Sequence, residues 1–441
     1  MAADVRPFGE LFAEPTRNGL TRPKAVRGSG IKMVNMGELF ANPRLCNAPM
    51  DRVPLTEGEA ERFLLADGDL LFARQSLVLE GAGKCSIFLH DTEPVTFESH
   101  VTRVRLHPDR GDPRFYFYYL QSHHGRAAIR SIVEQGAGAS GIRGSDLQTL
   151  RVRWLPIAEQ RAIAHILGTL DDKIELNRRT NETLEAMARA LFKSWFIDFD
   201  PVRAKAEGRD TGLPPHIAEL FPDAFEDLEL GEIPKGWTPS TVADVCETVT
   251  RGVTPKYEEG SRRYIINQRV NRGARLDWAS LKELSATLVV PPDCYAQCWD
   301  VLVNCLGEGT LGRTHLFQGL SGVYAVDQHM SMCRAKTAAG GTYLYQVLAS
   351  QEGQERIASL KTGSTGMTML NITKLRGFEL LWPGAALVDL YFKVVEPVWH
   401  RVANSERQSE TFAGLRDVLS PKLISGELSP NGLQARRGGT A

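Results

Sequence analysis

Two clusters of basic residues carry the side chains best suited to binding an anionic polymer. Residues 15–37 contain five cations and no Asp or Glu, whereas residues 251–275 contain seven cations with amides between them and two acids, Glu258 and Glu259. Lysine and arginine neutralise phosphates, and the forked ends of Arg, Asn and Gln can hydrogen-bond base edges. We expect DNA contact, although a solvated charged surface is the alternative. The candidates are Arg17, Arg22, Lys24, Arg27, Lys32, Arg251, Lys256, Arg262, Arg263, Asn267, Gln268, Arg269, Asn271, Arg272 and Arg275.

Two glycine-rich loops add candidates for phosphate contact. Residues 136–144 and 362–368 are rich in Gly, Ser and Thr, and Arg143 adds a cation to the first. Glycine allows backbone N–H groups to approach a phosphate closely. A plain helix-to-strand turn explains the same composition equally well.

Sequence motifs of catalysis are missing or degraded. Neither the Asn-Pro-Pro-Phe nor the Asp-Pro-Pro-Tyr tetrad of adenine methyltransferases occurs. Residues 81–86 read like part of a phosphate loop, but Val78 occupies the position of its first glycine and Cys85 that of its magnesium-binding hydroxyl. We therefore predict a chain that is not an enzyme and binds no cofactor of its own.

Possible metal ligands occur only in incomplete sets. His123 and His124 are adjacent and so cannot face one side of a helix together. Asp198 and Asp200 lack an identifiable third ligand, and the seven cysteines are scattered without two pairs at zinc-site spacing. No metal site is predicted. Buried, reduced thiols and the lack of a long apolar run favour a cytoplasmic protein.

Charge is distributed unevenly along a chain whose formal net charge is −1. Residues 1–156 hold 20 basic and 18 acidic residues, and residues 237–383 hold 15 and 13. Residues 196–236 hold only 4 basic residues against 10 acidic ones. One acidic connector thus offsets two slightly basic blocks, and global charge decides nothing about nucleic-acid binding.

The chain repeats itself. Eight short matches occur in the same order, and their offsets change only gradually, staying between 234 and 225 residues, as expected of a duplicated domain with small insertions. Each copy has strand-like runs, a helical stretch, a Gly/Ser loop and a closing strand, which predicts an α+β domain. The matches include 69–73 with 300–304, 116–120 with 343–347, 138–141 with 363–366, and 154–156 with 381–383.

A long helix follows each copy. Residues 157–198 contain one glycine and no proline, and apolar residues recur at heptad spacing from Ile163 to Trp195. The second helix, placed at residues 384–428, contains Pro397, which we expect to kink it or to displace its start. Its predicted seam includes Tyr391, Val394, Val398, Arg401, Ser405, Gln408, Phe412, Leu415 and Leu419.

Both seams are polar at their centres. In an antiparallel coiled coil with aligned centres, Asn177 and Asn181 would meet Gln408 and Ser405. Paired polar groups in a seam fix its register. Exposure of these positions to solvent or to another protein is an equally good interpretation.

These patterns predict six segments. They are a first domain at 1–156, a long helix at 157–198, an acidic, proline-rich linker without a packed core at 199–236, a second domain at 237–383, a second helix at 384–428 and a disordered tail at 429–441. The fold class is α+β, with two tandem-duplicated domains separated by two long antiparallel helices. Two rigid helices would hold two DNA-binding domains at a fixed distance. This arrangement suits a DNA site in which two specified sequences are separated by a gap of unspecified sequence.

The first helix resembles a known family. Residues 155–160 (LPIAEQ), 166–177 (ILGTLDDKIELN) and 191–201 (LFKSWFIDFDP) resemble the first central helix of type I restriction–modification specificity subunits. The order of domain, helix, domain and helix matches end to end. The second helical region departs from the pattern because it lacks the Glu159-Gln160 start.

This resemblance implies a mechanism. Each target-recognition domain would read one half of a bipartite DNA site, and the antiparallel helices would set the gap. The helices would dock two DNA adenine methyltransferase subunits, and a helicase–nuclease subunit would join for cleavage. S-adenosylmethionine, ATP and magnesium would belong to these partners. The predicted partner-docking residues are Glu159, Gln160, Ile163, Ile166, Phe192, Trp195 and Phe196.

Two other functions are considered. A coiled-coil scaffold with duplicated protein-binding domains would show DNA affinity that is insensitive to reversal of the basic clusters. A stand-alone DNA-modifying enzyme would show activity as a lone chain.

Overall fold

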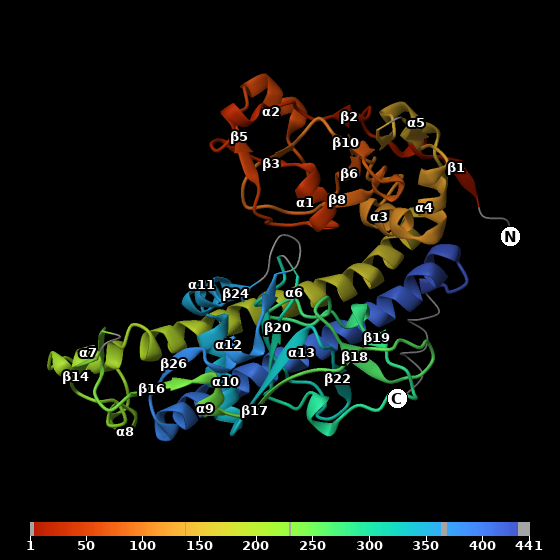
Figure 1. Ribbon diagram of the computed structural model, residues 1–441. Coiled ribbons are helices and arrows are strands. Elements are labelled where there is room, and N and C mark those ends of the chain that lie inside the picture. The colour runs from red at the N-terminus through yellow and green to blue at the C-terminus, as the bar shows by residue number, and fades with distance from the viewer. Residues whose placement is uncertain (1–3, 137, 229–230, 308, 363–367, 431–441) are drawn as a thin grey trace, which may run out of the picture. The chain divides into compact units, whose positions relative to one another are not determined.

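The computed structural model describes residues 4–136, 138–228, 231–307, 309–362 and 368–430. It divides into two compact units, and each is described by itself (Figure 1). Unit 1 comprises Met1–Leu176 and Gln408–Ala441, and unit 2 comprises Asn177–Arg407. Most of the predicted glycine loop at 362–368 and most of the tail lie outside the described residues.

Unit 1 is built on a five-stranded sheet of order β2-β10-β6-β8-β4. Its central strand β6 is fully buried, which matches its uninterrupted Leu-Leu-Phe-Ala sequence. β10 pairs antiparallel with β2 and β6, and β4 pairs parallel with β8. The strands are β2 (Arg17–Asn18), β4 (Arg44–Leu45), β6 (Leu70–Ala73), β8 (Cys85–Phe88) and β10 (Val101–Val104).

A smaller mixed sheet, a three-stranded antiparallel sheet formed by β7, β11 and β12, and a two-stranded pair complete the strands of unit 1. In the order β5-β3-β9, β3 pairs antiparallel with β5 and parallel with β9. The further elements are β1 (Val5–Pro7), β3 (Ile31–Val34), β5 (Asp51–Val53), β7 (Gln75–Ser76), β9 (Val95–Phe97), β11 (Glu134–Gln135), β12 (Ser140–Gly141), β13 (Arg151–Arg153), α1 (Met36–Ala41), α2 (Glu57–Phe63), α3 (Pro113–Gln121), α4 (His123–Arg130) and α5 (Gly144–Thr149).

Unit 2 repeats this topology. Its main sheet has the order β17-β23-β20-β21 and its mixed sheet the order β19-β18-β22, in which β18 again has one antiparallel and one parallel neighbour. The elements are β16 (Thr238–Thr241), β17 (Cys246–Arg251), β18 (Tyr264–Ile266), β19 (Lys282–Glu283), β20 (Val301–Asn304), β21 (Thr314–Leu316), β22 (Tyr324–Val326), β23 (Met330–Ala335), β24 (Lys361–Thr362), β25 (Met369–Leu370), β26 (Glu379–Trp382), α9 (Val242–Val245), α10 (Ala338–Ala349), α11 (Gln351–Ser359) and α12 (Ile372–Arg376).

A buried tyrosine marks the same place in both units. The hydroxyl of Tyr116 on α3 donates to the carbonyl of Arg153, and that of Tyr343 on α10 donates to the carbonyl of Leu381. The residues that follow these carbonyls, Trp154 and Trp382, are therefore equivalent. This shifts the sequence match by one residue, because the match had aligned Trp154 with Leu381.

The two long helices are α6 (Ile157–Phe196) and α13 (Ala385–Ser425), and each contributes one part to each unit. Within unit 2 they run antiparallel, since Asn181 contacts Val402 whereas Asn177, earlier on α6, contacts Ser405, later on α13. Asn177 Nδ2 donates to the Ser405 carbonyl at 3.1 Å and Asn181 Nδ2 to the Val402 carbonyl at 3.2 Å. The two helices therefore pair about one turn away from the predicted register of Asn177 with Gln408 and Asn181 with Ser405, and both acceptors are backbone carbonyls. In unit 1 Arg416 of α13 pairs with Asp171 of α6 at 2.8 Å.

The seam of α13 differs from the prediction. Val395, Trp399 and Val402 are buried, whereas Val394 is 44% exposed. Spacing from Tyr391 allows either 394 or 395 to continue a heptad, and packing against the domain selects the latter: the ring of Trp399 meets that of Tyr345 at 5.4 Å. The helix continues through Pro397.

The segment 199–236, expected to be a linker without a packed core, is folded instead. It contains α7 (Asp200–Ala206), α8 (Pro215–Ala218), β14 (Phe225–Leu228) and β15 (Gly231–Pro234). Val202 and Phe221 are buried in the core of unit 2, where Phe221 meets the ring of Trp195 at 5.2 Å. Prolines occupy the first turns of α7 and α8 and the last position of β15, where they are compatible with regular structure. The high proline content therefore does not indicate an unfolded linker, and that prediction was wrong.

Candidate DNA interface

In each unit, the chain that follows the first edge strand of the main sheet lies against a turn between two later strands. Gly19 and Gly252 hold equivalent positions there, because a Cβ at Gly19 would collide with the carbonyl of Phe97 and one at Gly252 with that of Val326. Only glycine allows this close approach. It brings each basic cluster beside the turn that carries His100 in unit 1 or His329 in unit 2.

Four cations of the unit 2 cluster are exposed, and no hydrogen bond or ion pair engages their side chains within the described part of the chain. They are Lys256, Arg262, Arg269 and Arg275. Arg262 also has a φ of +57°, a conformation that costs a non-glycine residue about 1–3 kcal/mol and often marks a functional position. These four side chains are available to a ligand.

Tyr257 lies among these cations and was missed by sequence reasoning. Its side chain is 47% exposed, and Lys282 Nζ lies 4.7 Å from the ring centroid. Partial burial raises the pKa of Tyr257, and the charge of Arg269 opposes that rise. An exposed aromatic ring close to the cations Lys282 and Arg269 would have indicated a binding site. Lys282 lies outside the basic cluster in the sequence, so this proximity could not be recognised before the fold was known.

Other members of the unit 2 set hold the fold. Arg263 donates to the carbonyls of Ser285, Ala286 and Leu288, and so fastens the loop after β19. Asn271 is fully buried and donates to Asn304 Oδ1 at 3.0 Å. The remaining four are also engaged or enclosed: Arg251 donates to the Leu370 carbonyl, Asn267 caps its own turn, Arg272 pairs with Asp277, and Gln268 Oε1 is buried.

The unit 1 cluster is largely paired with acids. Arg22 contacts Glu59 at 2.6 Å, and Lys32 contacts the buried Asp91 at 2.9 Å. The pKa of Glu59 is lowered to about 2, first by the backbone hydrogen bond from Thr56 and then by Arg22. The other members are Arg27, paired with Asp51; Arg17, over the Phe63 ring; Arg143, which is 70% exposed beside Glu134; and Lys24, exposed without a side-chain partner among the described residues.

The two turn histidines are at the surface. The side chain of His100 is 54% exposed beside Glu98, and that of His329 is 39% exposed with Nδ1 2.7 Å from Asp327. Their equivalent positions next to the basic clusters make them candidates for DNA contact. A histidine after a strand has the same sequence context in a core and at a turn, so sequence alone did not separate them.

All seven predicted docking residues are enclosed to some degree. Ile163, Phe192, Trp195 and Phe196 are at most 4% exposed, because the domain of their own unit covers them. Gln160 is fully buried, and its amide binds the N–H of Asp112 and the carbonyls of Arg110 and Leu155. Ile166 packs against the same core, and Glu159 is half-buried. A partner would therefore use other residues of these helices.

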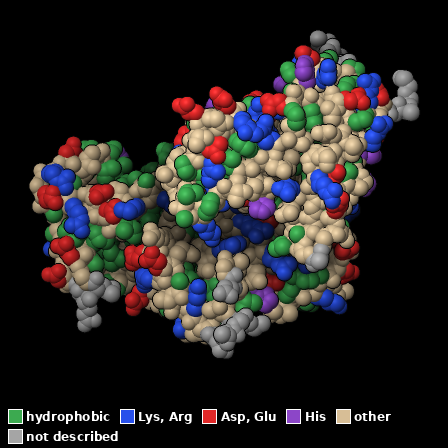
Figure 2. Space-filling view, turned by 90° about the horizontal axis from the view of Figure 1, so that it is seen from above, with side chains coloured by type: hydrophobic (Ala, Val, Ile, Leu, Met, Phe, Trp, Pro, Cys, Tyr) green, Lys and Arg blue, Asp and Glu red, His purple; other side chains and the backbone are tan. Residues whose placement is uncertain are grey.

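The degraded motifs have structural roles. Lys84 of the apparent phosphate loop donates to the Phe40 carbonyl at 2.9 Å. All seven cysteines are free, and no set of three or more metal-ligand side chains converges within the described ranges. None of the described helices is long and apolar enough to cross a membrane. Figure 2 shows cations interspersed with acids over much of one face.

Comparison with known proteins connects this architecture to a family. Residues 16–186 match the family model described as the type I restriction modification DNA specificity domain. The chain is 22% identical to the HindI specificity subunit of Haemophilus influenzae over 90% of this chain and 94% of that protein. It is 23% identical to the MjaIX specificity subunit of Methanocaldococcus jannaschii, covering 73% and 70% of the two chains.

This chain belongs to the specificity subunits of type I restriction–modification systems. The fold agrees, since the specificity-subunit crystal structure from M. genitalium superposes with a TM-score of 0.52 at 14% identity, covering 96% of both chains. The role of this specificity subunit is therefore DNA sequence specificity within a type I restriction–modification complex. The duplicated α+β domains and the antiparallel helices are those of its family.

Proposed function

We propose that each unit of this specificity subunit reads one half of a bipartite DNA site, and that the subunit is not itself catalytic. The observation that supports this is the duplicated topology, in which each mixed sheet presents a basic loop beside a histidine-bearing turn. In unit 2 the proposed contacts are Lys256, Arg262, Arg269, Arg275, Tyr257 and His329. In unit 1 they are Lys24, His100 and Arg143, whose ion pair with Glu134 is solvent-exposed and therefore weak.

The remaining predicted residues support these contacts rather than make them. Arg263 and Asn271 hold the unit 2 loops in place, and Lys32 and Arg22 hold those of unit 1. Cations without a partner release counterions when they meet phosphates, whereas paired cations must first lose an ion pair.

Helices α6 and α13 are proposed to set the unread gap. A heptad inserted into α6 between Leu176 and Asn177, with a matching one in α13 between Arg407 and Gln408, adds about 10 Å at about 1.5 Å per residue. The methylated motif of the complex should then have a longer gap and unchanged half-sites. Altered half-site sequences would contradict the division of reading between the units.

The same helices are proposed to dock two methyltransferase subunits, with a restriction subunit completing the complex. Exposed apolar side chains on both helices support this where they lie one turn apart, as Leu415 and Val418 do, because contiguous apolar patches on a surface mark interaction sites. On α13 these are Leu415 and Val418 in unit 1 and Val394 in unit 2, and Met187 of α6 is 60% exposed. Leu415→Gln together with Val418→Gln should weaken binding of a methyltransferase subunit. The matched control is Leu320→Gln together with Val323→Gln, which makes the same changes at exposed positions outside the long helices.

A further inference from the structure

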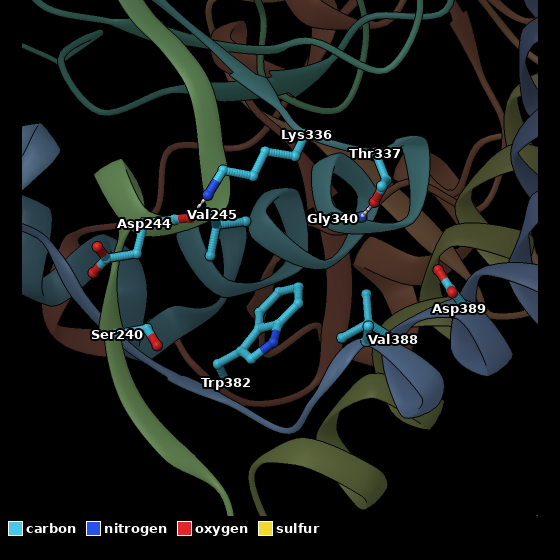
Figure 3. A pocket seen from close by; sticks show the side chains of 10 residues that line it. Ser240, Asp244, Val245, Lys336, Thr337, Gly340, Trp382, Val388 and Asp389 are labelled. Atoms are coloured by element: carbon cyan, nitrogen blue, oxygen red, sulfur yellow. Dashed lines mark hydrogen bonds between the residues drawn. The ribbon is translucent and has the colours of Figure 1, made fainter.

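A cavity of about 330 Å³ opens at the surface of unit 2 where α13 begins (Figure 3). Trp382 of β26 rises between Val245 and Val388, and its indole forms the apolar floor. Ser240 of β16 lies beside it, and Asp389 of α13 is exposed at the margin. The cavity therefore combines an aromatic surface with a carboxylate.

Unit 1 fills the equivalent position with its own arginine. β1 pairs with β13 as β16 pairs with β26, and the register makes Arg6 the equivalent of Ser240. The Arg6 guanidinium carbon lies 4.5 Å from the ring centroid of Trp154, the equivalent of Trp382. The cavity of unit 2 thus exists where a small serine replaces a cation that covers tryptophan in unit 1.

The acidic surroundings of that cation recur in unit 2. In unit 1 Asp4 contacts Arg6 at 2.7 Å, and the pKa of Arg6 is raised, first by that hydrogen bond and also by the charge of Glu10. Glu10 is the third residue of the short helix after β1, and Asp244 is the third residue of the short helix after β16. Both units therefore place an acidic residue at this position of the fold.

The charges lining the cavity favour a cation. Asp244 and Asp389 contribute two carboxylates, and the low pKa of Asp244, caused first by its hydrogen bond from the Thr241 side chain, keeps that group ionised. Lys336 contributes one ammonium group, which is engaged with the backbone carbonyl of Asp244 at 2.7 Å. The sum is one negative charge beside an indole face, which attracts cations.

We propose that the Trp382 cavity of unit 2 receives an arginine side chain of the methyltransferase subunit. This rests on the proposed docking function, and it names one chemical feature of the partner. Arginine fits because its planar guanidinium stacks on an indole and pairs with a carboxylate, as Arg6 does in unit 1. The two units then differ, because unit 1 supplies its own arginine and only unit 2 takes one from outside.

The chemistry of the cavity can be tested on the full chain without a partner. In protein labelled with fluorotryptophan, the Trp382 resonance is assigned through Trp382→Phe and followed during titration with N-acetylarginine amide. We expect that resonance alone to shift, with no shift for the uncharged N-acetylcitrulline amide and none in Ser240→Arg, where the cavity is filled from within. Equal shifts with both compounds, or none with either, would overturn the proposal.

The identity of the partner is tested by binding to the methyltransferase subunit. Ser240→Arg should weaken binding by about tenfold, whereas Ser240→Ala, which leaves the cavity open, should bind like the wild type. Asp389→Asn, at an exposed position whose side chain makes no hydrogen bond or ion pair among the described residues, should weaken it in the same direction. Normal binding by both Ser240→Arg and Asp389→Asn contradicts the cavity proposal alone. A wild-type chain that binds no methyltransferase subunit contradicts the proposed docking function itself.

Discussion

Arg334 and Asp300 form a two-point ion pair in unit 2, with Nε 3.0 Å from Oδ1 and the terminal nitrogen 2.7 Å from Oδ2. Arg105 and Asp69 form the same pair in unit 1, with both distances 2.7 Å. Both aspartates are 1% exposed and also accept a backbone N–H from three residues earlier. The pair ties the main sheet to the turn before it in both copies of the fold.

Asp300→Ala should lower the free energy of unfolding of unit 2 by about 3 kcal/mol, because it leaves a partly buried guanidinium without its partner. Six of the seven tryptophans lie in unit 2, so denaturant unfolding followed by tryptophan fluorescence reports on it. Glu207→Ala, which removes an exposed ion pair with Arg209, should cost less than about 1 kcal/mol. Equal effects would contradict a structural role for the buried pair.

His315 should make the stability of unit 2 depend on pH. Burial lowers the pKa of His315 from 6.5 to about 4, so between these values the unfolded chain binds a proton that the folded chain does not. The free energy of unfolding therefore falls as pH drops from about 6.5 towards 4, and this loss levels off below that. His315→Asn should reduce the difference in unfolding free energy between pH 7.5 and pH 4.5; an unchanged difference would rule out this residue as the cause.

Asn181→Leu should stabilise the helix pair of unit 2 by about 1 kcal/mol. The Asn181 side chain is 8% exposed; its Nδ2 donates to the Val402 carbonyl, but its buried Oδ1 has no hydrogen-bond partner in the described structure. Replacing an incompletely satisfied polar group in a seam by an apolar one usually raises stability and loosens register. Denaturant unfolding measures the change, with Asn177→Leu, which removes the bond to Ser405, as the comparison. Destabilisation by Asn181→Leu would show that the amide is better satisfied than the geometry indicates.

Removing the unpaired cations should weaken DNA binding in a salt-dependent way. Each of Lys256→Gln and Arg262→Gln should lower the slope of log affinity against log salt by about one, if each side chain neutralises one phosphate. Arg209→Gln removes an exposed cation from the 199–236 segment and should leave the slope unchanged. Binding of the assembled methyltransferase complex to its DNA site provides the measurement. An equal effect of Arg209→Gln would point to overall charge rather than a defined interface.

The architecture could be predicted because a duplication and a heptad repeat can both be recognised from the order of residues in the sequence alone. It did not separate Arg262 from Arg263, because only the fold decides which of two adjacent arginines meets backbone carbonyls. It also took Phe192 and Trp195 for a docking surface, although the domain of the same chain covers them. Apolar helical residues identify a buried face but not what buries it.

The most direct test of the account is to map methylated adenines across the genome of a host that carries this system, with the gene intact, deleted and restored. The account predicts that deletion abolishes methylation at one bipartite, gapped motif, that the wild-type gene restores it, and that exchanging unit 2 changes one half of the motif only. A motif that persists without the gene, or changes in both halves after that exchange, would contradict it.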